Sequence, residues 1–205
     1  MLSQPTDPVC GMPASIDAKS VVDFWRWAFS DLCDDDIKGW LAEWYVGLLL
    51  DLPMTRRVSW ANSDLIAPNG ARIEVKASAH WQSWKRVSED GSAKVVEPLA
   101  ESAVNRVRFG GLRAGDSVTI SSSPAALKSH LYVFAFQAQL DPNGWDALNL
   151  DHWEFYMVER SVLDALAVKS ISLTRLRTLS PTLSAESFRA AGKEWLAAFE
   201  PERAF

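Results

Sequence analysis

The sequence predicts an α/β domain in which a mixed central β-sheet is flanked by helices. Helical patterns lie near both ends of the chain and strand patterns lie between them, an order that is typical of a sheet covered by helices. The chain has 205 residues, of which 48% are hydrophobic, and this suffices for one well-packed α/β domain but is short for two. We therefore expect a single domain over residues 18–205, preceded by an irregular arm over residues 1–17.

Two helices are expected before the first strand, over Ser20–Leu32 and Asp34–Asp51. In the second helix Asp34 can cap the N-terminus, and Asp35 and Asp36 in the first turn complement the helix dipole. This helix has one apolar face rich in aromatic residues and another face of small residues. A helix that is apolar on nearly all sides is usually buried, so we expect burial of both faces.

A β-hairpin follows, with strands over Arg57–Ala67 and Ala71–Ser78. A three-residue loop, Pro68–Gly70, pairs Asp64 with Glu74, whereas a two-residue Asn-Gly turn would shift the register by one residue and place Asp64 on the wrong face. The loop residues favour the first arrangement. Proline and asparagine suit the two central positions of a type I turn, and glycine suits the left-handed position that closes a three-residue loop.

The remaining elements are expected to complete the sheet and its helical cover. Residues 79–103 lack a regular period, so we expect a loop with short helical pieces there. Further strands are expected over Asn105–Phe109, Leu131–Leu140 and Trp153–Val158. One later helix is expected to open at Ser161, where Asp164 would complete a capping box, and another over Ser184–Phe199.

Composition argues against several classes of protein. The net charge of −5 disfavours a protein that coats nucleic acid, because such proteins are usually basic. Cys10 and Cys33 are too few for a disulfide framework, and neither the cysteines nor the three histidines have the spacing of zinc ligands. No segment resembles a signal peptide or a membrane span. We therefore expect a cytoplasmic protein without a membrane partner.

Asp64, Glu74 and Lys76 form the most informative motif. In the predicted hairpin Asp64 and Glu74 face each other, and Lys76 shares their face because strand side chains alternate. Two carboxylates offer the oxygen ligands that Mg²⁺ prefers, with Mn²⁺ as a substitute. The Lys76 ammonium would orient the attacking water or neutralise charge on the phosphate. The three residues are therefore candidates for metal-dependent cleavage of a phosphodiester, with Asp64 and Glu74 as metal ligands.

The pattern of Asp64 followed by Glu74–Lys76 resembles the PD-(D/E)xK nuclease superfamily, with Ser63 in the position of the name-giving proline. The resemblance runs from the second predicted helix to Gln82 and implies a restriction-endonuclease-like core. It also implies that the backbone carbonyl of Val75 helps to hold the metal. Gln82 resembles the extra glutamine of some branches, which makes it a further catalytic candidate that would donate to a phosphate or a base edge. An exposed loop position is the equal alternative for Gln82.

Glu43 is a candidate for an additional metal ligand. It lies in the small-residue face of the second helix, with Gly39 and Gly47 one turn away on either side. The glycines would let this helix approach the sheet closely, and a buried carboxylate must be paired or coordinated. In the resembled family a helix before the hairpin often donates such an acid. The alternative for Glu43 is an ion pair with Arg56 or Arg57.

Four basic residues are candidates for contacts with nucleic acid: Lys85, Arg86, Arg106 and Arg108. Arg106 and Arg108 alternate along a predicted strand, so both would face one side and could follow a phosphate backbone. A solvated surface is the commoner explanation for each basic cluster taken singly. These basic residues would support binding of nucleic acid only if they come together around Glu74.

Together the motif and the resemblance predict a Mg²⁺-dependent nuclease, with DNA as the favoured substrate, in restriction, phage defence or mobile-element processing. A homodimer is compatible with this function. One alternative is a nuclease-fold module that binds nucleic acid or protein without turnover. Another is a structural ion network on a hairpin of an unrelated α/β protein. The nuclease hypothesis requires Asp64, Glu74 and Lys76 to converge at a concave edge near Glu43.

Overall fold

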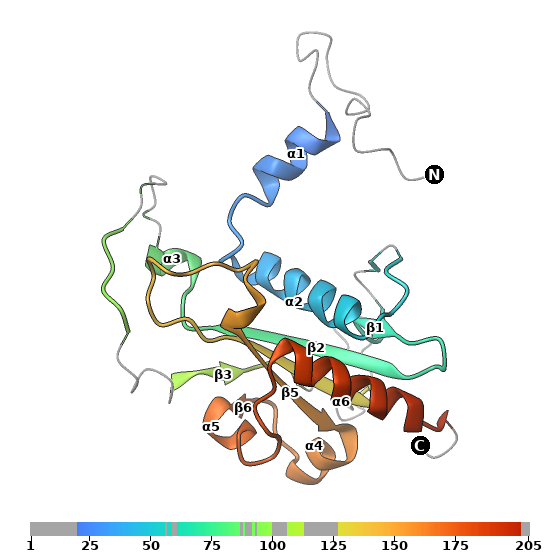
Figure 1. The fold of residues 1–205 in the computed structure, drawn as a ribbon. Coiled ribbons are helices and arrows are strands. Elements are labelled where there is room, and N and C mark those ends of the chain that lie inside the picture. Colours follow the sequence, from blue (N-terminus) through green and yellow to red (C-terminus); the bar gives the residue numbers. More distant parts are fainter. Residues whose placement is uncertain are drawn as a thin grey trace, which may run out of the picture.

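The computed structural model describes most of the chain from residue 20 onward. The described residues are 20–55, 57–58, 61–86, 88, 92, 94–99, 106–112 and 127–201. Their helices are α1 (Val21–Ala28), α2 (Asp35–Leu49), α3 (Ser83–Arg86), η3 (Leu150–His152), α4 (Arg160–Leu166), α5 (Leu173–Leu176) and α6 (Ala185–Ala198). Their strands are β1 (Leu65–Ile66), β2 (Arg72–Ala79), β3 (Arg108–Phe109), β4 (Leu131–Gln137), β5 (Trp153–Glu159) and β6 (Ile171–Ser172) (Figure 1). The arm predicted over residues 1–17 lies outside the described residues.

A mixed four-stranded sheet, in the order β1-β2-β4-β5, forms the centre of the fold. β2 runs parallel to β4, with Glu74 level with Tyr132, while β1 and β5 run antiparallel to their neighbours. β3 and β6 form a separate antiparallel ribbon. The predicted mixed α/β sheet flanked by helices is therefore confirmed. Among the described residues no helix is long and apolar enough to cross a membrane.

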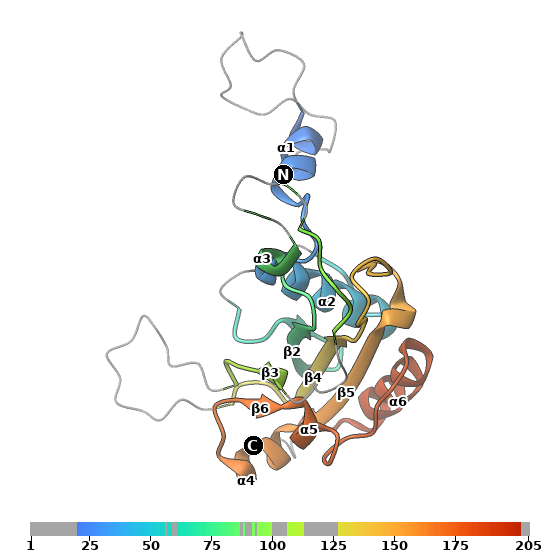
Figure 2. The ribbon, with the colours of Figure 1, turned by 90° about the vertical axis from the view of Figure 1, so that its left-hand side faces the viewer.

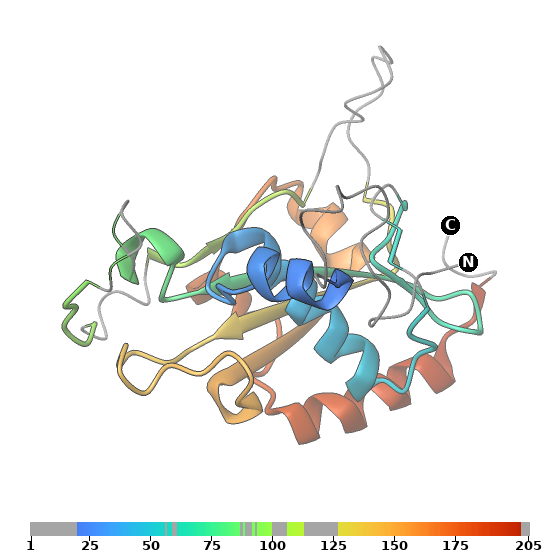
Figure 3. The same ribbon diagram turned by 90° about the horizontal axis from the view of Figure 1, so that it is seen from above.

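Two hydrophobic cores lie on opposite faces of the sheet. On one face α2 packs against β2, with Ile73 and Val75 in the shared core, and α6 packs against β5 and α2. On the other face the β3–β6 ribbon, α4 and α5 cover the aromatic side chains of β4. Figures 1 and 3 show α6 and α4 on opposite sides of the sheet. Because strand residues alternate, Glu74 and Lys76 lie on the face of β2 opposite to α2.

Burial of both faces of α2 was predicted, and this prediction is wrong. The small-residue face is buried, with Ala42 and Val46 fully covered by the sheet. The aromatic face is only partly covered, because Tyr45 is buried beside Trp153 whereas Trp40 and Trp44 are 38% and 47% exposed. A single layer of sheet packs against α2, so the side of the helix that points away from this layer stays open to solvent. The N-terminal cap at Asp34 is as predicted.

α1 stands apart from the sheet in both Figure 1 and Figure 2. It is closed at its N-terminus by a capping box between Ser20 and Asp23, and none of its residues is buried. It ends at Ala28, four residues before the predicted end at Leu32. Its aromatic residues are exposed, most of all Trp27 at 77%.

Further boundaries differ from the prediction: β3 begins at Arg108 and not at Asn105, and β4 ends at Gln137 and not at Leu140. The strand expected over Arg57–Ala67 is reduced to the two residues of β1. The helix expected to open at Ser161 begins at Arg160, and its N-cap residue Glu159 makes no capping bond through its side chain. Asp164 pairs instead with Arg160 at 3.1 Å, one turn away, so the predicted capping box is not formed.

Candidate functional site

The loop that joins β1 to β2 has the three residues that the sequence predicted. Ala67 and Ala71 face each other across it, and the Ala67 N–H donates to the Ala71 carbonyl at 2.9 Å. Gly70 has a φ of +84°, the left-handed conformation that this position requires. β1 pairs Leu65 with Ile73, and the same register places Asp64 level with Glu74. The predicted hairpin register is therefore confirmed.

Asp64 lies where backbone pairing between the two strands ends. Its carboxylate oxygen Oδ2 accepts a hydrogen bond from the Val75 N–H at 2.7 Å. The Asp64 side chain thus accepts the β2 backbone N–H that a longer β1 would use for pairing. This explains why β1 is so short. The bond also fixes the orientation of the carboxylate at the open edge of β2, because a charged acceptor gains most from a backbone N–H.

Glu74 and Lys76 point to the same face of β2, as predicted. The Lys76 ammonium lies 2.8 Å from Glu74 Oε1, and both side chains are about one-fifth exposed. The other carboxylate oxygen of Glu74 lies 3.5 Å from the hydroxyl of Ser129, which in turn lies 3.0 Å from the hydroxyl of Ser63. Ser129 is fully buried, so these contacts restrict the movement of the Glu74 side chain.

Burial and neighbouring charge shift the pKa of Asp64 strongly. Burial contributes most and the negative charge of Glu74 adds to it, so that the pKa rises from 3.8 to about 7. The Val75 N–H and the charge of Lys76 oppose this rise, whereas Glu43 adds to it. Asp64 is therefore electrostatically coupled to the other two predicted trio members and to Glu43.

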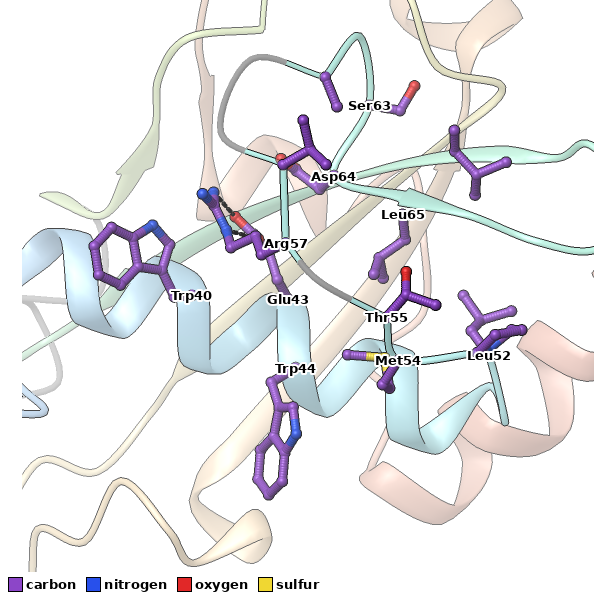
Figure 4. A pocket seen from close by; sticks show the side chains of 14 residues that line it. Trp40, Glu43, Trp44, Leu52, Met54, Thr55, Arg57, Ser63, Asp64 and Leu65 are labelled. Carbon is purple, nitrogen blue, oxygen red and sulfur yellow. Dashed lines mark hydrogen bonds and ion pairs between the residues drawn. The ribbon is translucent and has the colours of Figure 1, made fainter. Parts of the chain in front are cut away.

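Glu43 forms a two-bond ion pair with Arg57, at 2.6 Å and 2.8 Å. The Arg57 guanidinium also lies over the ring of Trp40, 5.4 Å from its centre. Figure 4 shows this pair between Trp40 and Asp64. The predicted alternative, an ion pair with a neighbouring arginine, therefore describes Glu43 in this state of the protein.

A site with Glu43 as third ligand is not assembled. Among the residues that the structure describes, no three His, Cys, Asp or Glu side chains are grouped closely enough to hold a metal. The reason is geometric, because α2 covers one face of β2 while Glu74 lies on the other. Asp64 and Glu74 remain as a two-carboxylate set. They are the residues that could hold Mg²⁺, because this ion accepts carboxylate oxygens and keeps several waters.

Gln82 lies away from the trio, beyond the end of β2. Its side-chain oxygen accepts a hydrogen bond from Lys38 at 2.6 Å, and Lys38 is nearly fully buried. Lys38 also pairs with Asp35 at 2.7 Å in the first turn of α2. The described contacts of Gln82 are therefore with the beginning of α2 and with the carbonyl of Ala79, and not with the trio.

The predicted basic residues are distributed over two regions. Arg106 and Arg108 are both exposed and alternate with the buried Val107 and Phe109, but only Arg108 belongs to a strand, β3. Just after them, Gly111 approaches the trio, since a Cβ at this position would lie 3.8 Å from the Lys76 ammonium. Lys85 is exposed and donates to the carbonyl of His80 at 3.2 Å. The side chain of Arg86 lies outside the described part of the structure.

Comparisons with protein-family models, with curated proteins and with solved structures found no match to this chain. The superfamily resemblance thus stays a prediction from the motif.

Sequence reasoning missed two features of the site. Ser129 belongs to the segment before β4, and only the parallel pairing of β2 with β4 brings it to Glu74. The stacking of Arg57 on Trp40 was also missed. No local pattern announces either contact, because both join segments that are distant in sequence.

Proposed function

We propose that this protein is a Mg²⁺-dependent nuclease that hydrolyses phosphodiester bonds, with DNA as the favoured substrate. One observation carries the proposal: the Asp64 carboxylate, held by the Val75 N–H, lies beside the Glu74–Lys76 pair at the end of the β1–β2 ladder. Two carboxylates and an ammonium are the groups that metal-dependent phosphodiester cleavage requires. The restriction-endonuclease-like core and a role in restriction, defence or mobile-element processing belong to the same proposal.

Each residue has a distinct role in this proposal. Asp64 and Glu74, with the Val75 carbonyl, would hold the cation, which when bound supplies Lewis-acid polarisation of the phosphate. Lys76 would orient the attacking water or neutralise charge that develops on the phosphate. Its 2.8 Å contact with Glu74 keeps the ammonium on the side of the carboxylates.

Incubation of the purified protein with plasmid, linear, single-stranded and modified DNA tests this function. We expect cleavage with Mg²⁺ or Mn²⁺ and none with EDTA. A matched RNA substrate establishes whether DNA is preferred. Absence of cleavage of every substrate with either metal would contradict the proposal.

The exposed aromatic residues favour a second candidate, a nuclease-fold module that binds a partner without turnover. Trp27 of α1 and Trp44 of α2 present large apolar surfaces to solvent. Phe24 lies 6.3 Å from Trp27, ring centre to ring centre, and exposed apolar side chains that gather in this way often mark a site of interaction. This candidate predicts binding without cleavage in the same assays.

A further inference from the structure

A cavity of about 460 Å³ opens beside Asp64, between α2, the segment that follows it and β1. Apolar side chains make up most of its wall, including Trp40, Met54 and Leu65. Its polar groups include Glu43, Arg57 and Asp64, which lie together in Figure 4. A mostly apolar cavity with a few convergent polar groups is typical of a site for a small organic group.

We propose that this cavity binds one unpaired base of the strand whose phosphate lies at Asp64 and Glu74. This inference rests on the proposed function, and it names the substrate class as single-stranded or locally unpaired nucleic acid. Asp64 belongs both to the cavity wall and to the proposed metal site, so an occupant of the cavity adjoins the phosphate.

The wall of the cavity offers a surface on which a base can stack. Trp40 and the Arg57 guanidinium lie one over the other, and the Glu43 carboxylate holds the guanidinium in place by two bonds. Bases stack on aromatic rings and on guanidinium planes. Trp40 remains 38% exposed and Arg57 is also partly exposed, so a ligand can reach both side chains.

The polar end of the cavity suits a base better than a second phosphate. Glu43 and Asp64 are acidic, and the charge of Arg57 is already neutralised by Glu43. Carboxylates accept hydrogen bonds from the amino groups of bases, whereas they repel phosphate. A base in an intact duplex is stacked and paired, so entry would first cost a few kcal/mol to extrude it. An unpaired base enters without this cost.

Binding of an oligonucleotide that carries the fluorescent base 2-aminopurine tests the inference. The protein is used as wild type with EDTA and as Lys76→Ala with Mg²⁺, so that binding is measured without cleavage. The probes are a single strand, a duplex with the fluorescent base unpaired and a perfect duplex. A single-stranded RNA and a free nucleoside monophosphate identify the source of the base.

We expect saturable quenching with the single strand and the unpaired duplex, and at least tenfold weaker binding of the perfect duplex. Trp40→Ala should weaken binding about 5- to 150-fold, the range for loss of one stacking contact. Trp40→Phe keeps a ring and should restore most of the affinity. Trp25→Ala removes a tryptophan of similar exposure, 41% against 38% for Trp40, that lies outside the cavity, and it should leave binding unchanged.

Equal binding of Trp40→Ala and wild type, or equal binding of perfect duplex and single strand, would overturn the inference. Cleavage of intact duplex without quenching would leave the nuclease standing and remove the base site. If quenching depends on Trp40 but the protein cleaves no substrate, the base-binding site is supported and the proposed nuclease activity is refuted.

Discussion

Asp64 is the residue whose position and charge matter most for the chemistry of the proposed site. It accepts a hydrogen bond from the Val75 N–H at the end of the β1 ladder, while burial and, secondly, the charge of Glu74 oppose its ionisation. The bond fixes the carboxylate, whereas burial and repulsion make its ionised form costly in the metal-free protein. A divalent cation would reverse this balance. Metal affinity should therefore increase as pH rises through about 7, the pKa of Asp64.

The raised pKa of Asp64 also predicts how stability depends on pH. Below the unfolded value of 3.8 the carboxyl is protonated in both states. Between 3.8 and about 7 only the unfolded state loses the proton, so the free energy of unfolding falls as pH rises. The total is at most about 4.5 kcal/mol, at about 1.4 kcal/mol per pH unit.

Asp64→Asn removes this titration and isolates its effect. In metal-free urea unfolding, the variant should gain stability relative to wild type between pH 4 and pH 7. The other titrating groups contribute equally to the free energy of unfolding of both proteins, so their contributions cancel in the difference. Parallel stability curves for variant and wild type would contradict the raised pKa.

Ser129 positions Glu74, and its removal should weaken metal binding. The buried hydroxyl lies 3.5 Å from Glu74 Oε2 and 3.0 Å from Ser63. Groups that orient a metal ligand typically contribute 10- to 100-fold to affinity, and we expect about tenfold here because the contact is long. Calorimetric titration of Ser129→Ala with Mn²⁺ measures the effect.

Ser180→Ala is a matched control for this variant. Ser180 is also buried, and its hydroxyl accepts the Met157 N–H at 3.0 Å on β5. Its loss should cost stability without changing metal affinity. A wild-type affinity for Ser129→Ala would show that Glu74 needs no such support.

The β1–β2 hairpin is the element that sets the register of the site. Gly70 adopts a φ of +84° with open space around it, so Gly70→Ala should cost about 1–2 kcal/mol of stability through the backbone alone. Gly39 of α2 also has open space around it but has a helical backbone. Gly39→Ala should therefore stabilise by about 0.5–1 kcal/mol. Urea unfolding should give opposite signs for the two variants, and equal signs would contradict this account of the loop.

The hairpin could be predicted because residues that are adjacent in the sequence determine its structure. Three consecutive residues, Pro68–Gly70, specify the loop, and the loop specifies which side chains face each other. The apolar runs of β4 and β5 and the cap of α6 at Ser184 were predictable for the same reason. The exposed face of α2 was not, because it depends on how many layers pack against the helix. The position of Glu43 on the far face of β2 depends on the same packing.

At the scale of the whole molecule, an acidic protein must concentrate its basic residues where it binds nucleic acid. The net charge is −5, while Arg106 and Arg108 are both exposed in the short segment that leads to Gly111. Arg108→Ala should weaken binding of any DNA sequence and reduce the slope of log K against log salt by about 1. Titrations at several salt concentrations measure this slope. An unchanged slope would place the phosphate contacts elsewhere.

The central claim is that Asp64, Glu74 and Lys76 carry metal-dependent cleavage, and two variants measured side by side test it most directly. DNA cleavage and the metal-induced shift in melting temperature are recorded for Lys76→Ala and Glu74→Gln. Both should lose cleavage, because one lacks the ammonium and the other a metal ligand. Lys76→Ala should keep the metal-induced shift, since a ligand that binds only the folded state stabilises it, and Glu74→Gln should lose this shift. Cleavage by Lys76→Ala at the wild-type rate would contradict the claim.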